Sequence, residues 1–314
     1  MRRAAVWSAG AIVGRLSPHR AAGMALVAVM WVVAALSIFA MSLAASSRGE
    51  VRSAQSARGF AEAAAYGDAA IQLAARELKF ATDPVDRRLT LSYPIDDRQL
   101  VVRVSPGGGF VDLNGASQAL LRDLFVFGAG LDAEQAELLA QRIADWRDPD
   151  EDALPLGAEN PAYEAAGVAF RTRGGPFDTP EDLLQVLGVS FDIYDKISGF
   201  VTTQTGAAGV DPLAASKGVL RVLARGDAAV ADVFSAARDA KEPSIDTTAF
   251  TQEHILSSSG TVYYIEAFYP GEGGRTLARA RWVDLGAEGP AGLPWRSMRV
   301  EPVRSFVSED GHGA

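Results

Sequence analysis

The stretch Pro18–Ala45 reads PHRAAGMALVAVMWVVAALSIFAMSLAA, and the fate of this stretch decides how the rest of the chain is used. An uncharged apolar run follows Gly23. At a helical rise of about 1.5 Å per residue, Met24–Ala45 is long enough to cross the hydrocarbon core of a bilayer. Secretory signal peptides have a shorter apolar region of about 7–15 residues. The stretch therefore predicts a transmembrane helix that is retained.

The residues before the apolar run are basic, and none of them is acidic. They include Arg2, Arg3, Arg15, His19 and Arg20. By the positive-inside rule the N-terminus lies in the cytoplasm and the remainder of the chain on the other side of the membrane. Ser42-Leu43-Ala44 also fits the small-x-small pattern of signal peptidase, so removal of the whole segment is an open alternative.

A basic leader that ends in glycine directly before an apolar run resembles the signal of type IV prepilins and pseudopilins. The resemblance implies cleavage by prepilin peptidase between Gly23 and Met24, which removes the leader and keeps the helix as an anchor. Most pseudopilins have a glutamate at the fifth mature position, where it is thought to neutralise the terminal amine of the subunit ahead. Here that position is Ala28. The missing acid implies a subunit with no neighbour ahead of it, at the tip of a filament.

Composition excludes several classes of function. The 314 residues carry a formal net charge of −9, which disfavours broad nucleic-acid binding because that needs a cationic face. The chain has no cysteine, and therefore no disulfide, cysteine nucleophile or thiolate metal site. His254 has no partner pattern typical of catalysis, and the sequence has no G-x-S-x-G, H-E-x-x-H or P-loop motif.

The apolar pattern beyond the membrane predicts a long helix followed by strands. A helical stripe runs through Arg48–Phe80, at Phe60, Ala64, Gly67, Ile71, Ala74 and Leu78. Asp83-Pro84 ends this helix. The sequence RLTLSYPIDDRQLVVRVSP, residues 88–106, then alternates as two short strands.

The middle of the chain predicts repeated helical hairpins. Asn114 or Ser117 caps a first helix, a turn follows at Gly128–Gly130, and a second helix runs from about Ala133 to Trp146. This pair looks like a helix-hairpin-helix unit. In nucleic-acid-binding members of that class the hairpin amides hold a phosphate, but Asp132, Glu134 and Glu137 surround the turn here. Related segments follow, one with a cap at Thr179 and a helix near Phe191–Ile197, and another at 209–239.

Several motifs occur in a fixed order that is more specific than any one of them. They are Gly23-Met24 without the following glutamate, VDLNGAS, IADWRDPDED, LGAENPAYEAAG, GGPFDTPEDLLQVLGVS and GVDPLAAS. Together they resemble the general secretion pathway protein K family, the large minor pseudopilins of type II secretion systems. The resemblance implies an α+β fold with an N-terminal transmembrane and stalk helix, a pseudopilin α/β body with a small antiparallel sheet, and a large all-α insertion of helix-hairpin-helix or SAM-like type.

The expected domains follow this pattern. They are a cytoplasmic leader at 1–23, a transmembrane helix at 24–45, a stalk helix with the first strands at 46–110, the helical insertion at 111–240, returning strands at 241–285, and a partly disordered extension at 286–314. The returning strands are expected at Thr261–Phe268 and Thr276–Asp284, joined by the hairpin sequence YPGEGG.

The segment DWRDPDEDALPLGAEN concentrates carboxylates after the second predicted helix. Taken alone, it also fits a solvated acidic loop. Calcium binds several oxygen ligands on flexible loops, and the resemblance implies calcium in the helical domain. The first candidate ligands are Asp148, Asp150 and Glu151, followed by Asp152 and Glu159.

The resemblance implies a non-enzymatic assembly protein in the bacterial inner membrane, with its body in the periplasm. It implies assembly with the minor pseudopilins I and J into a complex that caps and initiates the major pseudopilin filament, for export of folded proteins. No nucleic-acid partner is expected. Two alternatives stay open, a competence-type DNA-binding membrane protein and a membrane-anchored periplasmic hydrolase with a site that no motif reveals.

Overall fold

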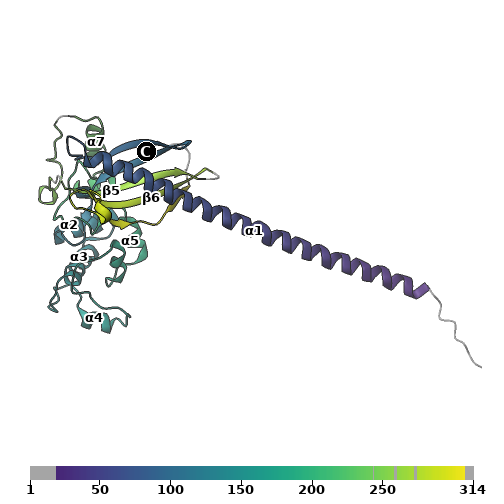
Figure 1. The fold of residues 1–314 in the computed structure, drawn as a ribbon. Coiled ribbons are helices and arrows are strands. Elements are labelled where there is room, and N and C mark those ends of the chain that lie inside the picture. Colours follow the sequence, from purple (N-terminus) through teal and green to yellow (C-terminus); the bar gives the residue numbers. More distant parts are fainter. Residues whose placement is uncertain (1–18, 243, 258–259, 272–273, 308–314) are drawn as a thin grey trace, which may run out of the picture. The chain divides into compact units, whose positions relative to one another are not determined.

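The computed structural model describes residues 19–242, 244–257, 260–271 and 274–307 (Figure 1). It divides into two compact units, Met1–Gly59 and Phe60–Ala314. The long helix α1, His19–Lys79, contributes to both. The predicted leader lies outside the described residues up to residue 18, and the predicted cleavage pair Gly23-Met24 falls within the bounds of α1.

The first unit contains the apolar segment of α1. Met24–Ser42 has a mean hydropathy of 2.5 and is unburied over its length. Large apolar side chains are freely exposed on it, such as Met24 at 76% and Trp31 at 74%. A helix that is apolar on all sides needs lipid or other helices around it. The segment therefore fits a single membrane anchor, as the sequence predicts.

In the second unit, the last turns of α1 pack on a sheet through small side chains. The buried residues are Ala63, Gly67, Ala70, Ile71, Ala74 and Ala75. The predicted stripe is correct at Gly67, Ile71 and Ala74, whereas Phe60 is 39% exposed. A Cβ added to Gly67 would lie 2.5 Å from Cβ of Arg279. The small residues therefore allow close contact between the helix and the strand that carries Arg279.

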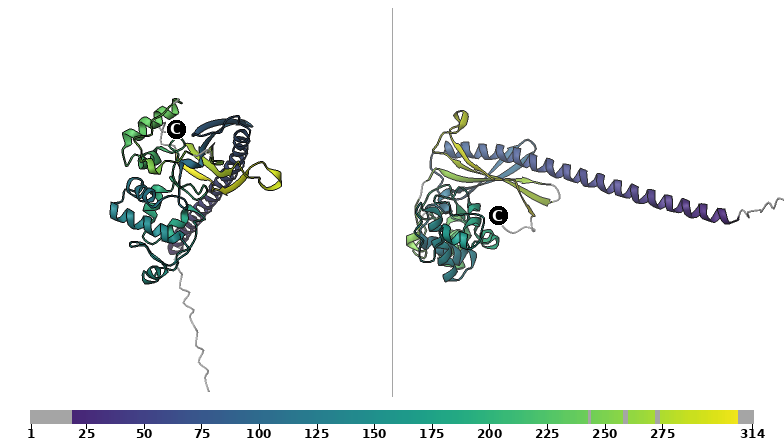
Figure 2. Two further views of the ribbon diagram at one scale, coloured as in Figure 1. Left: turned by 90° about the vertical axis from the view of Figure 1, so that its left-hand side faces the viewer. Right: turned by 90° about the horizontal axis from the view of Figure 1, so that it is seen from below.

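The sheet has six antiparallel strands in the order β1-β2-β5-β6-β7, with β8 also paired to β6 (Figure 2). Their bounds are β1 Leu89–Ile95, β2 Arg98–Pro106, β5 Val262–Pro270, β6 Arg275–Asp284, β7 Arg296–Val300 and β8 Arg304–Val307. The predicted strand pairs correspond to β1 with β2 and to β5 with β6.

The two faces of the sheet carry different side chains because successive residues of a strand point to opposite sides. Leu100, Val102 and Val104 of β2 join Ile265 and other β5 residues in a buried core with α1. On the other face, the register aligns Ser105 with Tyr264 and Trp282, and Arg103 with Glu266. Figure 2 shows the last turns of α1 over one face of the sheet and helical segments beside the other.

The helical segments form one insertion between β2 and β5, which are neighbours in the sheet. Its own core contains Leu120, Leu124, Ile143, Leu183 and Leu220 among others. The helices are η1 Gly107–Gly109, α2 Gln118–Asp123, η2 Leu124–Ala129, α3 Ala133–Arg147, α4 Asn160–Ala165, η3 Pro180–Gln185, α5 Phe191–Ile197, α6 Lys217–Leu223, α7 Ala228–Asp239 and η4 Gln252–His254; η6 Pro290–Gly292 lies after the insertion.

Three features differ from the expected organisation. The insertion contains a short parallel ladder of β3 Val111–Asp112 and β4 Val201–Thr202 besides its helices. The helical core extends past residue 240, because Phe250 is buried in it. The sheet extends past residue 285, because β7 and β8 both pair with β6. Residues 308–314 of the expected C-terminal extension lie outside the described residues.

Candidate functional site

Helix α3 positions the acidic segment that the sequence singles out. Asp132 caps this helix, since its carboxylate accepts a hydrogen bond from the amide of Gln135 at 2.9 Å. Ala136, Leu139, Ala140 and Ile143 form the buried face, as predicted. Asp145 and Trp146 are also buried in the last turn, and Asp148 ends the helix. The carboxylates of 145–159 therefore begin on a fixed helix end.

The residues that carry the family resemblance meet beside this helix end. Arg147 donates from Nη1 to the carbonyl of Leu113 at 2.8 Å and from Nη2 to that of Ala116 at 2.9 Å. The side chain of Asn114 exchanges two hydrogen bonds with the backbone of Phe177, at 2.7 and 3.0 Å. The ring of Phe177 stacks on Trp146, with centroids 5.8 Å apart. These motif residues therefore act as structural links within the insertion.

Asp145 is the most buried carboxylate of the segment, with no exposed surface. Its two oxygens lie 3.3 and 3.2 Å from the amide of Leu154, which donates to them. Burial raises the pKa of Asp145, although backbone hydrogen bonds from Leu154 and Ala158 oppose this effect. Asp145 belongs to the predicted acidic segment but is not among its candidate calcium ligands. At 3.6 residues per turn, Asp145 lies on the side of α3 opposite to Ala136 and Ile143, so the helical pattern does not predict its burial.

Two other carboxylates have a buried oxygen without a partner in the described part of the chain. They are Oδ1 of Asp148 and Oε1 of Glu159. Glu159 is only 3% exposed, and its Oε2 accepts from Oγ1 of Thr172 at 3.3 Å. Burial, and then the negative charge of Asp145, raise the pKa of Glu159 to about 7. Burial and the charge of Asp150 raise the pKa of Asp148. Ionisation of both Asp148 and Glu159 is therefore electrostatically unfavourable in this cluster.

The remaining candidates lie on the exposed part of the loop. Oδ1 of Asp150 accepts from the amide of Asp152 at 3.0 Å, and Oε1 of Glu151 accepts from Nδ2 of Asn160 at 2.7 Å. Asp152 is exposed. Among the described residues, no group of three or more carboxylate or histidine side chains is arranged to hold a metal ion. The structure thus brings Asp148 and Glu159 near Asp145 and leaves Asp150, Glu151 and Asp152 nearer to solvent.

His254, which the sequence left without a partner, pairs with a carboxylate inside the helical core. Its Nε2 lies 3.1 Å from Oδ2 of Asp123, and both side chains are buried. Asp123 also accepts from Arg122, at 3.2 and 3.1 Å. The pair joins α2 to the segment that leads back to the sheet, and this position fits a structural link.

The comparisons with known proteins agree on one family. Residues 111–205 match the family model of type II secretion system (T2SS) protein K. Over 125 residues the chain is 22% identical to type II secretion system protein K of Pectobacterium carotovorum subsp. carotovorum, a match that covers 35% of this chain and 38% of that protein.

The fold is similar to that of a chain in the crystal structure of the GspK–GspI–GspJ complex from the enterotoxigenic Escherichia coli type 2 secretion system. The TM-score is 0.53 and the identity 15%, and the match covers 82% of this chain and 99% of that chain. This likeness confirms the predicted fold class, a mixed structure with an N-terminal apolar helix and a small antiparallel sheet.

Proposed function

We propose that this chain is a minor pseudopilin of the type II secretion system protein K kind and that it caps the pseudopilus tip, because residues 111–205 match the model of that family. The observation that carries the proposal is the placement of the matched domain. It is inserted between neighbouring strands of a small sheet that packs on the N-terminal helix. An assembly protein of this kind helps to initiate the filament that exports folded proteins.

Two features support the position at the tip. Ala28 stands at the fifth position of the predicted mature chain, where most pseudopilins have an acid that is costly within a bilayer. A subunit with no neighbour ahead has no terminal amine to neutralise. The second feature is the insertion, which covers residues 107–261 between β2 and β5. A domain of that size beside the sheet would block the addition of another subunit above it.

The chain is proposed to sit in the inner membrane by one helix, with its N-terminus in the cytoplasm and its body in the periplasm. Prepilin peptidase would cut between Gly23 and Met24. Mass spectrometry of the membrane-extracted protein is expected to give a mature N-terminus at Met24, with or without methylation. A Gly23→Val variant should keep its leader. A mature start near Ala45, or full secretion activity of the uncut variant, contradicts the proposal.

Minor pseudopilins I and J of the same system are the proposed partners, and the major pseudopilin filament is the structure that they initiate. A solved structure with a similar fold is a complex of GspK with GspI and GspJ. Co-purification of the three proteins from detergent extracts tests this assignment. Recovery of this chain without either partner, from cells in which secretion is active, would contradict it.

No feature of the described residues favours the two alternatives. In the helical hairpin, the start of α3 that would face a phosphate instead has the carboxylate of Asp132, which accepts a hydrogen bond from the amide of Gln135. We infer that the protein is not an enzyme, since the family that it matches is a secretion pseudopilin.

We further propose that the acidic segment binds a structural calcium ion. The fit rests on the buried oxygens of Asp148 and Glu159, which have no partner among the described residues and which a hard cation would satisfy. These two residues would hold the ion, and the exposed carboxylates of Asp150, Glu151 and Asp152 on the same loop would complete its ligands. Calcium would supply the positive charge that offsets repulsion among these carboxylates.

Thermal unfolding of the full chain in detergent micelles tests the calcium proposal. Calcium at about a hundred times its dissociation constant should stabilise the folded state by about 2.7 kcal/mol relative to chelator. Glu159→Gln should remove most of this gain, whereas Glu164→Gln, at an exposed glutamate of α4 paired with Arg171, should retain it. An equal midpoint for the wild type in calcium and in chelator would refute the site.

A further inference from the structure

A surface cleft of about 700 Å³ lies between the second face of the sheet and the helical insertion, inside the unit Phe60–Ala314. Tyr264 and Trp282 form an aromatic wall on the sheet, and Phe110 of the insertion packs against both. The ring centroid of Phe110 lies 5.8 Å from that of Tyr264 and 5.0 Å from that of Trp282, in edge contacts. Tyr194 and Pro180 line it from the insertion. A cleft of this volume, with apolar walls and a few polar groups, has the character of a ligand site.

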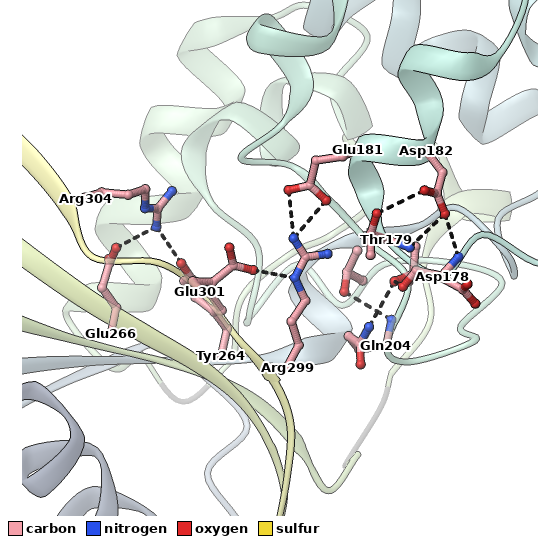
Figure 3. Close-up of polar contacts among 12 residues, drawn as sticks. Asp178, Thr179, Glu181, Asp182, Gln204, Tyr264, Glu266, Arg299, Glu301 and Arg304 are labelled. Carbon is pink, nitrogen blue, oxygen red and sulfur yellow. Dashed lines mark hydrogen bonds and ion pairs between the residues drawn. The ribbon is translucent and has the colours of Figure 1, made fainter. Parts of the chain in front are cut away.

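The carboxylates that line the cleft are already paired with arginines (Figure 3). Nη2 of Arg299 lies 2.7 and 2.8 Å from the two carboxylate oxygens of Glu181, and Nε lies 2.8 Å from Glu301. Arg304 donates to Glu266 at 3.1 Å and to the hydroxyl of Tyr264 at 2.7 Å. The negative charges of these glutamates are therefore already neutralised by arginines within the protein.

The cleft nevertheless keeps a surplus positive charge. Four arginines line it, against three glutamates; the arginines are Arg88, Arg103, Arg299 and Arg304, and the glutamates are Glu181, Glu266 and Glu301. Arg103 lies 3.6 Å from Glu266 and over the ring of Phe268. Because the chain as a whole carries −9, a local excess of cations is a departure from its general character.

Arg88 accounts for the surplus. It is half-buried, and within the described part of the chain its guanidinium has no hydrogen bond or ion pair. The charged groups that act on it are Arg103 and Arg238, which repel it, and Glu266 and Asp239, which attract it more weakly. A guanidinium does not deprotonate in a protein. Arg88 therefore keeps a half-buried positive charge whose lost hydration no described side chain replaces with a hydrogen bond.

We propose that the cleft binds a protein segment that presents a carboxylate beside an aromatic or large apolar side chain. Arg88 would receive the carboxylate, whose two oxygens match the fork of a guanidinium. The apolar side chain would pack on the aromatic wall formed by Phe110, Tyr264 and Trp282. A surplus of one positive charge matches one carboxylate better than the double charge of a phosphate.

This inference goes beyond the proposed function and holds whether or not the chain caps a pseudopilus. It is tested with the full chain in detergent micelles and a fluorescent peptide, blocked at both ends, of sequence Gly-Ser-Phe-Glu-Ser-Gly. A second peptide has Gln in place of Glu. Fluorescence anisotropy is expected to show at least about tenfold tighter binding of the Glu peptide, the equivalent of about 1.4 kcal/mol.

Arg88→Gln is expected to abolish the difference between the two peptides. Arg221→Gln, at an exposed arginine of α6 outside the cleft, should preserve it. The thermal midpoint of Arg88→Gln should be equal to or above that of the wild type, since the change removes repulsion and no hydrogen bond. Loss of binding without loss of stability is a result that a purely structural arginine would not give.

Four outcomes would overturn the proposal. The first is equal binding of the two peptides to the wild type, and the second is retained selectivity in Arg88→Gln. The third is binding of free 3-phenylpropanoate as tightly as the Glu peptide, which would assign the cleft to small acids. The fourth is a tenfold gain in affinity on neutralising Glu309 and Asp310, which would assign it to the chain's own end. None of these results depends on N-terminal processing, so they are separate from failure of the proposed function.

Discussion

Gly157 is the residue that lets the acidic loop close over α3. A Cβ at this position would lie 1.8 Å from Oδ2 of Asp145, far inside contact distance. Asp145 is fully buried and holds the loop through the amide of Leu154. Because both sides of the contact are fixed, the strain of an added methyl group has no easy release.

Gly157→Ala should therefore lower the free energy of unfolding by about 1–3 kcal/mol, the usual cost of overpacking. Gly175→Ala is the matched control, since a Cβ there meets nothing within 4 Å and the backbone has no positive φ. Thermal unfolding of the full chain in detergent checks both variants. Equal midpoints for the two variants would show that the loop moves freely away from Asp145.

The acidic segment also shows how far the site follows from sequence. The cluster of carboxylates is evident in the pattern, but which of them are buried depends on the path of the loop back over α3. Glu159 is only a secondary candidate in the sequence, yet it is buried, whereas Asp148 is partly exposed. Arg88 gives no signal at all, because its neighbours Arg103 and Arg238 are brought to it only by the fold.

The contact between α1 and β6 is fixed by one carboxylate. Oδ1 and Oδ2 of Asp68 accept from Arg279 at 2.7 and 3.3 Å and from Arg281 at 2.9 and 2.6 Å. Burial alone would raise the pKa of Asp68, but the hydrogen bonds from Arg279 and Arg281 outweigh it and lower the pKa. Ionised Asp68 therefore stabilises the packing of this helix on the sheet.

Asp68→Asn should destabilise the protein by about 1–3 kcal/mol at neutral pH, as expected for hydrogen bonds between charged groups. A lowered folded-state pKa means that this contribution is present above the unfolded value of about 3.9 and is lost as the pH falls through the folded-state pKa. The difference between wild type and variant should shrink in acid. The free energy of unfolding, measured from neutral pH into acid, checks this prediction. Asp97→Asn is the control, since the Asp97 side chain is 86% exposed. A difference independent of pH would contradict the assignment.

Local sequence signals predict most elements of the insertion. Ser117 caps α2, Thr179 and Asp182 form a capping box at η3, and α5 has the predicted bounds Phe191–Ile197. These features depend on residues three or four apart. The strands β7 and β8 were not predicted, because each is short and rich in exposed polar side chains. They form by pairing with β6, which is a non-local interaction.

Taken as a whole, the molecule joins two cores through adjacent strands. The sheet and α1 share one core, and the helices of the insertion share another. The chain leaves the sheet after Pro106 and returns by Tyr263, and these two residues are paired directly in the antiparallel register. The pairing of β2 with β5 is therefore independent of the long insertion that separates them in the sequence.

This geometry predicts that the insertion can be removed without unfolding the body. A two-residue Asn-Gly turn between Pro106 and Tyr263 should close β2 and β5 into an ordinary hairpin. The variant without the insertion, which keeps the whole anchor helix, should retain the sheet signal in circular dichroism and unfold cooperatively. Its midpoint should fall, because Tyr264 and Trp282 lose their contacts with Phe110.

The same shortened chain tests the role of the insertion in capping. If the insertion blocks addition of another subunit, the variant should still co-purify with minor pseudopilins I and J but should no longer occupy the filament end selectively. Its control is the Arg221→Gln variant, which keeps the whole insertion. Immunogold labelling of pseudopili checks where each protein lies. A shortened chain that folds and still labels only filament ends would show that the anchor helix, and not the insertion, determines the position at the tip.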